Sequence, residues 1–120
     1  MDRVSIVTAC FNASDDVRKC WESLKRQTYG VENLECIFVD DASDDEGATV
    51  NMLAGIEKEA PESVLLIQLD KNVRQGGARN AALQYASGEF ILFLAADDTL
   101  RQDRCNSLYE NAVTYECDLI

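Results

Sequence analysis

Short apolar segments alternate with amphipathic segments along the whole chain, and this pattern predicts strands and helices in turn. Continuous apolar runs, several of them rich in β-branched residues, predict strands at 4–9, 35–39, 64–69 and 89–94. Apolar residues spaced three to four positions apart predict a helix beginning at Asp15 and further helices at 48–59, 76–86 and 101–115. This alternation predicts an α/β fold: a mostly parallel sheet with right-handed crossovers and helices on both of its faces.

Turn and cap residues refine these boundaries. Ser14 is expected to cap the first helix, Gly76 and Gly77 to open the third, and Gly88 to follow its end. Residues 118–120 are apolar enough to begin a fifth strand. A natural domain rarely ends inside a strand, so we expect residues 1–120 to form a single domain that is the N-terminal part of a longer protein.

Composition narrows the class of protein. The 120 residues fit one domain, and an apolar content of 47% excludes a disordered chain. The 22 acidic and 11 basic side chains give a net charge of −11, which argues against a nucleic-acid partner or an anionic membrane surface. The five cysteines form no Cys-x-x-Cys pair and histidine is absent, so we expect free thiols in a cytoplasmic protein.

The segment after the strand at 89–94 carries the most informative chemistry. Two alanines and then Asp97 and Asp98 follow the apolar run. Adjacent carboxylates at the end of a buried strand require a cation or water between them. One interpretation is a divalent metal that carries a phosphate group; the other is a loop that caps the next helix.

The ends of the predicted parallel strands place further polar residues at the same edge of the sheet. Residues 8–12, 40–43 and 97–98 all emerge there, which is where open α/β sheets bind ligands. The helix start at Gly76 and Gly77 offers free N–H groups to an anion, although the glycines also suit an ordinary loop. Arg79 is placed to supply positive charge, and Arg74 has a similar but weaker claim.

Six segments in order and at suitable spacing resemble the nucleotide-binding half of the family 2 glycosyltransferases, which have the GT-A (Rossmann-like) fold. The segments are 4–12 (VSIVTACFN), 24–29 (LKRQTY), 38–45 (FVDDASDD), 77–83 (GARNAAL), 86–94 (ASGEFILFL) and 97–98 (DD). The likeness covers nearly the whole chain.

The resemblance implies a role for each matched residue. It implies that nucleotide is bound by Thr8, Ala9, Phe11, Asn12, Asp40, Asp41, Ser43, Arg79 and Asp97. Within this set, Phe11 would lie against the base, Asp41 would accept a base N–H, and Arg79 would lie near the diphosphate. Asp98, with Asp97, would hold Mg²⁺ or Mn²⁺, cations that prefer oxygen ligands.

The resemblance also implies an activity: inverting transfer of a sugar from a nucleotide-diphospho-sugar, most commonly UDP-linked, to an acceptor hydroxyl in glycan or polysaccharide synthesis. Ala95 stands where many members of the family have Asp, so one candidate metal group is missing. The catalytic base would lie beyond Ile120. The full-length protein is expected in the cytoplasm, at the inner face of the membrane. We therefore expect the 120-residue chain alone to be inactive, and to form homodimers through the surface that the missing half would cover.

Three other interpretations remain. An inactive GT-A-like interaction domain is consistent with Ala95. A receiver-type phosphoacceptor domain requires an acidic pair at the end of the first strand, where this chain has Thr8-Ala9-Cys10. A dinucleotide-binding domain requires Gly-x-Gly-x-x-Gly after that strand, and no glycine precedes Gly30.

Overall fold

The structure, a computed structural model, describes residues 3–115, and the side chains of residues 3–110. The fifth strand predicted at 118–120 lies outside the described residues. No described helix is long and apolar enough to cross a bilayer.

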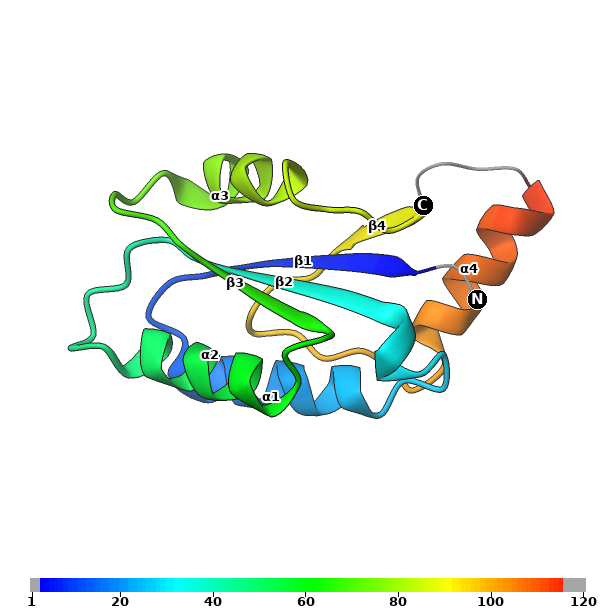
Figure 1. Cartoon of the computed structure of the whole chain (residues 1–120), viewed down its shortest axis with the longest axis horizontal. Helices are drawn as coiled ribbons and strands as arrows, with labels where there is room; N and C mark the ends of the chain where they lie inside the picture. Colours follow the sequence, from blue (N-terminus) through cyan, green and yellow to red (C-terminus); the bar gives the residue numbers. More distant parts are fainter. Residues whose placement is uncertain (1–2, 116–120) are drawn as a thin grey trace.

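A four-stranded sheet, in which all neighbouring strands are parallel, forms the centre of the molecule (Figure 1). Its strands are β1 (Val4–Cys10), β2 (Leu34–Asp40), β3 (Val64–Gln68) and β4 (Phe90–Phe93), in the order β3-β2-β1-β4. The register places Val4 opposite both Leu34 and Phe90, so β1 lies in the middle and its carboxyl end projects beyond that of β4. The predicted fold class and strand segments are confirmed.

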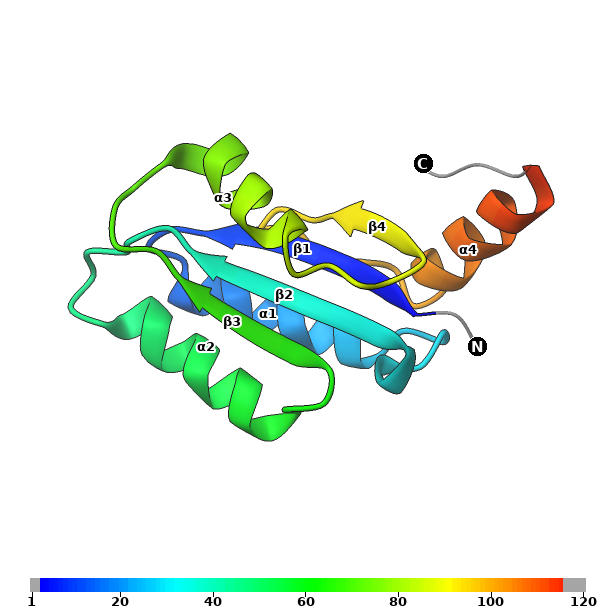
Figure 2. The same cartoon turned by 45° about the horizontal axis from the view of Figure 1, so that its top comes forward.

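Helices cover both faces of the sheet, as the alternation predicted. The helices α1 (Ser14–Lys25) and α2 (Ala48–Glu59) lie on one face and α3 (Arg74–Leu83) on the other (Figures 1 and 2). A 3₁₀ turn, η1 (Val31–Asn33), leads into β2, and α4 (Arg104–Tyr115) follows β4 after a long loop. This layered arrangement leaves the carboxyl edge of the sheet open to loops.

Two apolar clusters hold the layers together, one on each face. Between the sheet and α1 and α2, the fully buried side chains include Trp21, Leu24, Phe38, Leu53 and Ile56. The cluster under α3 is smaller and consists of Val7, Ile37, Val39, Ala78 and Ala82. Alanine on the inner face of α3 allows this helix to pack closely against the strands.

The cysteines belong to this core. Cys10, Cys20, Cys36 and Cys105 are all buried and free, which confirms the predicted thiol state for the cysteines in the described chain. Burial raises the pKa of Cys20 to about 12 and that of Cys105 to about 11. These thiols are therefore uncharged packing groups at neutral pH.

Two helix starts differ from the sequence expectation. Ser14 does not cap α1: it is the first helical residue, Ala13 takes the cap position, and the N–H of Ala13 donates to Thr49 Oγ1 at 2.9 Å. The helix α3 begins at Arg74, ahead of the predicted Gly76. Its start is fixed by Asp41, whose Oδ1 accepts the Val73 N–H at 2.7 Å, a contact between distant parts of the chain.

A polar network secures the amino edge of the sheet, opposite the open loops. The Glu35 carboxylate accepts hydrogen bonds from Ser5 Oγ at 2.7 Å and from both the N–H and Oγ of Ser87 at 2.8 Å. The Gly88 N–H donates to Ser5 Oγ at 2.8 Å. Gly88 lies so close to β1 that a Cβ there would be 2.6 Å from the Ser5 nitrogen. The chain thus enters β4 along a fixed path.

Candidate active site

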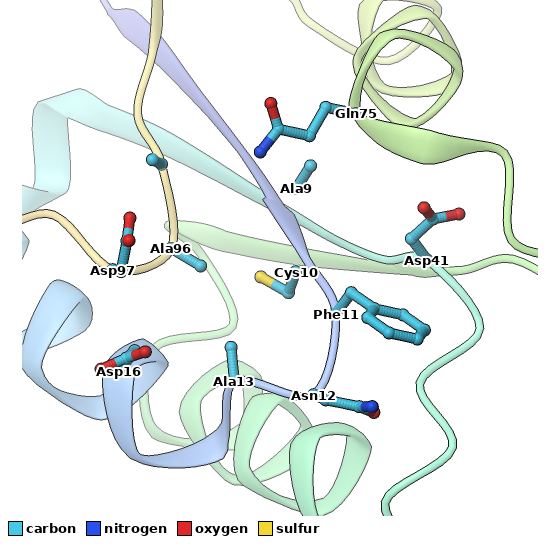
Figure 3. Close-up of a pocket in the computed structure, with 11 residues that line it drawn as sticks. Ala9, Cys10, Phe11, Asn12, Ala13, Asp16, Asp41, Gln75, Ala96 and Asp97 are labelled. Atoms are coloured by element: carbon cyan, nitrogen blue, oxygen red, sulfur yellow. The ribbon is translucent and has the colours of Figure 1, made fainter.

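A cavity of about 240 Å³ lies at the carboxyl edge of the sheet (Figure 3). The end of β1 and the turn after it, the end of β2, the first turns of α1 and α3, and the loop after β4 form its wall. Its lining residues are Ala9, Cys10, Phe11, Asn12, Ala13, Asp16, Asp41, Gln75, Ala95, Ala96 and Asp97. The predicted meeting of three strand ends is therefore present.

Asp40 and Ser43, two residues that the resemblance assigned to nucleotide binding, support this wall and do not line it. The Ser43 hydroxyl donates to Asp40 Oδ1 at 2.6 Å and accepts the Asn12 N–H at 3.0 Å. The Asn12 side chain in turn exchanges two hydrogen bonds with Asp44, at 2.6 and 2.9 Å. This chain of bonds ties the loop after β1 to the loop after β2 and holds Phe11 and Asn12 in place.

Asp41 joins three segments at the cavity. Its N–H donates to the Cys10 carbonyl at 2.8 Å, its carbonyl accepts from Asn72 Nδ2 at 3.1 Å, and its Oδ1 accepts from Val73 N–H. The residue is 4% exposed and lines the cavity. Since no described hydrogen bond engages Oδ2, this oxygen is the acceptor that the residue can offer to a ligand.

Three residues of β1 and the turn after it, all assigned to nucleotide binding by the resemblance, differ in their position relative to the cavity: Thr8, Ala9 and Phe11. Phe11 is 45% exposed and its ring lies beside Asp41 in Figure 3, as an aromatic surface at a polar cavity. Ala9 lines the cavity as well, and its small side chain leaves room. Thr8 is buried and does not line the cavity, and its hydroxyl has no hydrogen-bond partner in the described chain.

The acidic pair after β4 is exposed and only half of it reaches the cavity. Asp97 lines the wall, whereas Asp98 does not. The N–H of Asp98 donates to the Ala95 carbonyl at 3.0 Å in a tight turn. Asp16 lines the wall on the same side as Asp97 in Figure 3. Within the described residues, no three acidic, cysteine or histidine side chains are grouped to hold a metal by themselves.

Arg79, which the resemblance assigned to nucleotide binding, contacts a neighbouring ring and does not line this cavity. Its guanidinium carbon lies 5.3 Å from the centre of the Phe93 ring, a cation–π contact between α3 and the last residue of β4. Arg79 is absent from the cavity wall, and so is every other lysine and arginine of the described chain.

Backbone strain gathers at the same edge. Four residues other than glycine have positive φ angles in the described chain, namely Asn12 (48°), Ala42 (57°), Glu46 (59°) and Arg74 (66°). All four lie in or next to the turns that lead from β1, β2 and β3 into the following helices. Such conformations cost of order 1 kcal/mol each and are concentrated at functional sites in proteins. Strain and cavity thus point independently to this edge.

Several lining residues were not among the predicted ones. Cys10, Ala13, Gln75 and Ala96 were assigned no role in the sequence analysis, and Asp16 was not recognised as a site residue. The signal for Asp16 was available: α1 begins directly after the end of β1, so its first turn must lie at the same edge of the sheet. Gln75 was hidden because the predicted start of α3 was two residues too late.

An open parallel sheet with helices on both faces and a cavity outside the carboxyl ends of its strands defines a ligand-binding α/β domain. Residues 5–120 match the family model described as "Glycosyl transferase family 2". The chain belongs to this family.

Similar proteins agree with this assignment. The chain is 40% identical over 109 residues to the succinoglycan biosynthesis protein ExoO of Rhizobium meliloti, covering 91% of this chain and 29% of ExoO. The structure of Staphylococcus aureus TarS 1–349 in complex with UDP superposes with a TM-score of 0.81 at 25% identity, covering 95% of this chain and 33% of that one.

A second solved structure shows the fold alone. The mannosyltransferase PcManGT from Pyrobaculum calidifontis, in complex with GDP-Man and Mn²⁺, gives a TM-score of 0.80 at 24% identity, over 98% of this chain and 33% of that chain. The match to these glycosyltransferases confirms the GT-A fold. The chain spans about a third of the length of these relatives.

Proposed function

We propose that this domain binds a nucleotide-diphospho-sugar, UDP-linked, as the donor-binding half of an inverting glycosyltransferase in glycan or polysaccharide synthesis. The observation that carries the proposal is the cavity at the carboxyl edge, which is lined by an exposed aromatic ring (Phe11), a buried carboxylate (Asp41) and the first acid after β4 (Asp97). The UDP in the TarS complex and the polysaccharide in the name of ExoO support the donor and the product class.

Each side of the cavity has a task in this proposal. The Phe11 ring stacks on the base, and Asp41 Oδ2 accepts a hydrogen bond from the base N–H. Ala9 gives the base room, while Asp40 and Ser43 keep the two loops at a fixed spacing. Phe11 and Asp41 thereby orient the donor before any chemistry takes place.

Asp97 and Asp98 are the groups that suit a cation. The two adjacent exposed carboxylates would hold Mg²⁺ or Mn²⁺, which prefer oxygen ligands. When bound, such an ion stabilises negative charge on the departing nucleoside diphosphate. Mn²⁺ accompanies the nucleotide sugar in the PcManGT structure.

The catalytic base and the acceptor site belong, in this proposal, to residues beyond Ile120. Residues 1–120 then form a single donor-binding domain that binds nucleotide weakly and does not turn over by itself. We place the full-length enzyme in the cytoplasm, at the inner face of the membrane.

The test is a titration of the 120-residue chain with UDP, in the presence and absence of Mg²⁺, with binding monitored through changes in the amide NMR chemical shifts. We expect shifts at Phe11 and Asp41 that strengthen with Mg²⁺, and a loss of the Mg²⁺ effect in Asp98→Ala. Asp103→Ala removes an exposed carboxylate at the start of the α4 region and serves as the matched control. A folded chain that gives no UDP response at millimolar concentration would contradict the proposal and favour an interaction domain.

A further inference from the structure

The wall of the cavity carries negative charge and no positive charge that could bind the phosphates of a nucleotide. Asp16, Asp41 and Asp97 line it, and no lysine or arginine does. A nucleoside diphosphate brings several further negative charges, which these carboxylates repel. A divalent cation offsets part of this repulsion, but the diphosphate oxygens also need donors from the protein. Arg79, the arginine implied by the resemblance, already contacts the Phe93 ring.

Arg74 lies next to this wall. It is the first residue of α3, directly between Val73, whose N–H is held by Asp41, and Gln75, whose side chain lines the cavity (Figure 3). Arg74 is exposed and takes part in none of the ion pairs or side-chain hydrogen bonds found in the described chain. Its charge is therefore available to a ligand.

The backbone conformation at Arg74 is unfavourable for a long side chain. Its φ of 66° is a left-handed conformation, which glycine adopts freely and a long side chain does not. The surroundings impose this conformation: Asp41 holds Val73 on one side, and Val73 packs against Gly77, where a Cβ would lie 2.8 Å from the Val73 Cβ. An arginine in a conformation that glycine adopts more easily points to a function of its guanidinium.

We propose that Arg74 is the residue that binds the diphosphate of the donor, the role that the resemblance gave to Arg79. The guanidinium presents paired N–H donors that match phosphate oxygens. This inference rests on the proposed function, because it takes the ligand to be a nucleoside diphosphate.

The experiment compares UDP with uridine, which lacks the phosphates, in NMR titrations of the 120-residue chain with Mg²⁺. Arg74→Gln is expected to weaken UDP binding about tenfold and leave uridine binding unchanged, since one charge-assisted hydrogen bond is lost. Lys71→Gln removes the same charge from the same loop and is the matched control; it should change UDP binding less than twofold. Arg79→Gln should also retain UDP binding.

A second variant separates function from fold. Arg74→Gly should lose UDP affinity as Arg74→Gln does, while its melting temperature rises by about 2–4 °C because the left-handed backbone is relieved. If the wild-type chain binds no UDP, the proposed function and this inference both fail. If the wild-type chain binds UDP, two results overturn this inference alone. In one, Arg74→Gln binds UDP as tightly as the wild type does; in the other, Arg74→Gln loses affinity for UDP and uridine to the same extent.

Discussion

On the proposed function, replacing Asp41 with Asn should change the base that the cavity prefers from uracil to cytosine. The Asp41 carboxylate is 4% exposed, and its Oδ1 accepts the Val73 N–H at 2.7 Å. In the variant the amide must keep its oxygen toward Val73, because the opposite orientation would set two donors face to face. The amide NH₂ then replaces Oδ2 as the group that faces the ligand. Uracil N3 carries a hydrogen and cytosine N3 does not, so a donor in this position favours cytosine.

The hydrogen bonds of Asp41 allow the effect of Asp41→Asn on stability and its effect on UDP affinity to be estimated. The hydrogen bond from Val73 changes from a charged to a neutral acceptor, which costs about 1 kcal/mol of stability, or about 4 °C in melting temperature. The variant should therefore remain folded. Toward UDP it loses a charge-assisted hydrogen bond worth about 2 kcal/mol, which corresponds to about thirtyfold in affinity. Toward CDP it gains an acceptor for its new donor.

The assay is a pair of titrations, UDP and CDP with Mg²⁺, into the wild-type chain and into Asp41→Asn. The wild type should prefer UDP and the variant CDP. Asp41→Ala is the control: it removes both acceptors, so base preference should vanish and the melting temperature should fall by about 8 °C. A folded Asp41→Asn that still prefers UDP would refute the assignment of Oδ2 to the base.

Three further predictions concern the fold. Gly88→Ala should lower the free energy of unfolding by about 2–3 kcal/mol, because its Cβ would lie 2.6 Å from the Ser5 nitrogen; Gly55→Ala, in open space within α2, should raise it by up to about 1 kcal/mol, both measured by urea unfolding. Partial burial raises the pKa of Glu35, but the hydrogen bonds from Ser87 and Ser5 outweigh this effect and lower the pKa below its ordinary value of 4.5. The ionised Glu35 carboxylate therefore stabilises the fold above that pH, and this stabilisation is lost on acidification. The stability gap between wild type and Glu35→Gln should hence shrink below about pH 4.5 in acid unfolding; a constant gap would exclude this linkage. Four buried thiols should not react with a water-soluble disulfide reagent at pH 8 until denaturant is added: those of Cys10, Cys20, Cys36 and Cys105. Rapid reaction of any of these four in the native chain would contradict their burial.

The strands could be predicted because their signal is local. Each is a short apolar run bounded by polar residues, and its burial on both faces follows from the alternation with helices. The start of α3 could not be predicted in this way. It depends on the bond between Asp41 and the Val73 N–H, two groups that are far apart in the sequence. A glycine pair such as Gly76-Gly77 marks a turn locally but does not reveal this contact.

The site was predictable in its location and less so in its members. Parallel strands alone bring Phe11, Asp41 and Asp97 to one edge, and the structure confirms that they share a cavity. Which residues of β1 line the cavity depends on their position along the strand: Ala9 and Cys10 at its end line the cavity from opposite faces of the sheet, whereas Thr8, buried one residue earlier, does not. The contact of Arg79 with Phe93 joins a helix to the edge strand and has no signature in the sequence.

The two edges of the sheet differ in their hydrogen bonding and in their backbone conformation. At the amino edge, Glu35, Ser5 and Ser87 satisfy one another, and Gly88 lies in contact with β1. At the carboxyl edge the backbone has positive φ angles, Oδ2 of Asp41 takes part in no hydrogen bond found in the described chain, and the acidic pair after β4 is exposed to solvent. Groups that stabilise a fold are paired, and groups that bind a ligand must stay free until it arrives. The hydrogen bonds among Glu35, Ser5 and Ser87 at the amino edge therefore offset part of the strain in the turns of the carboxyl edge.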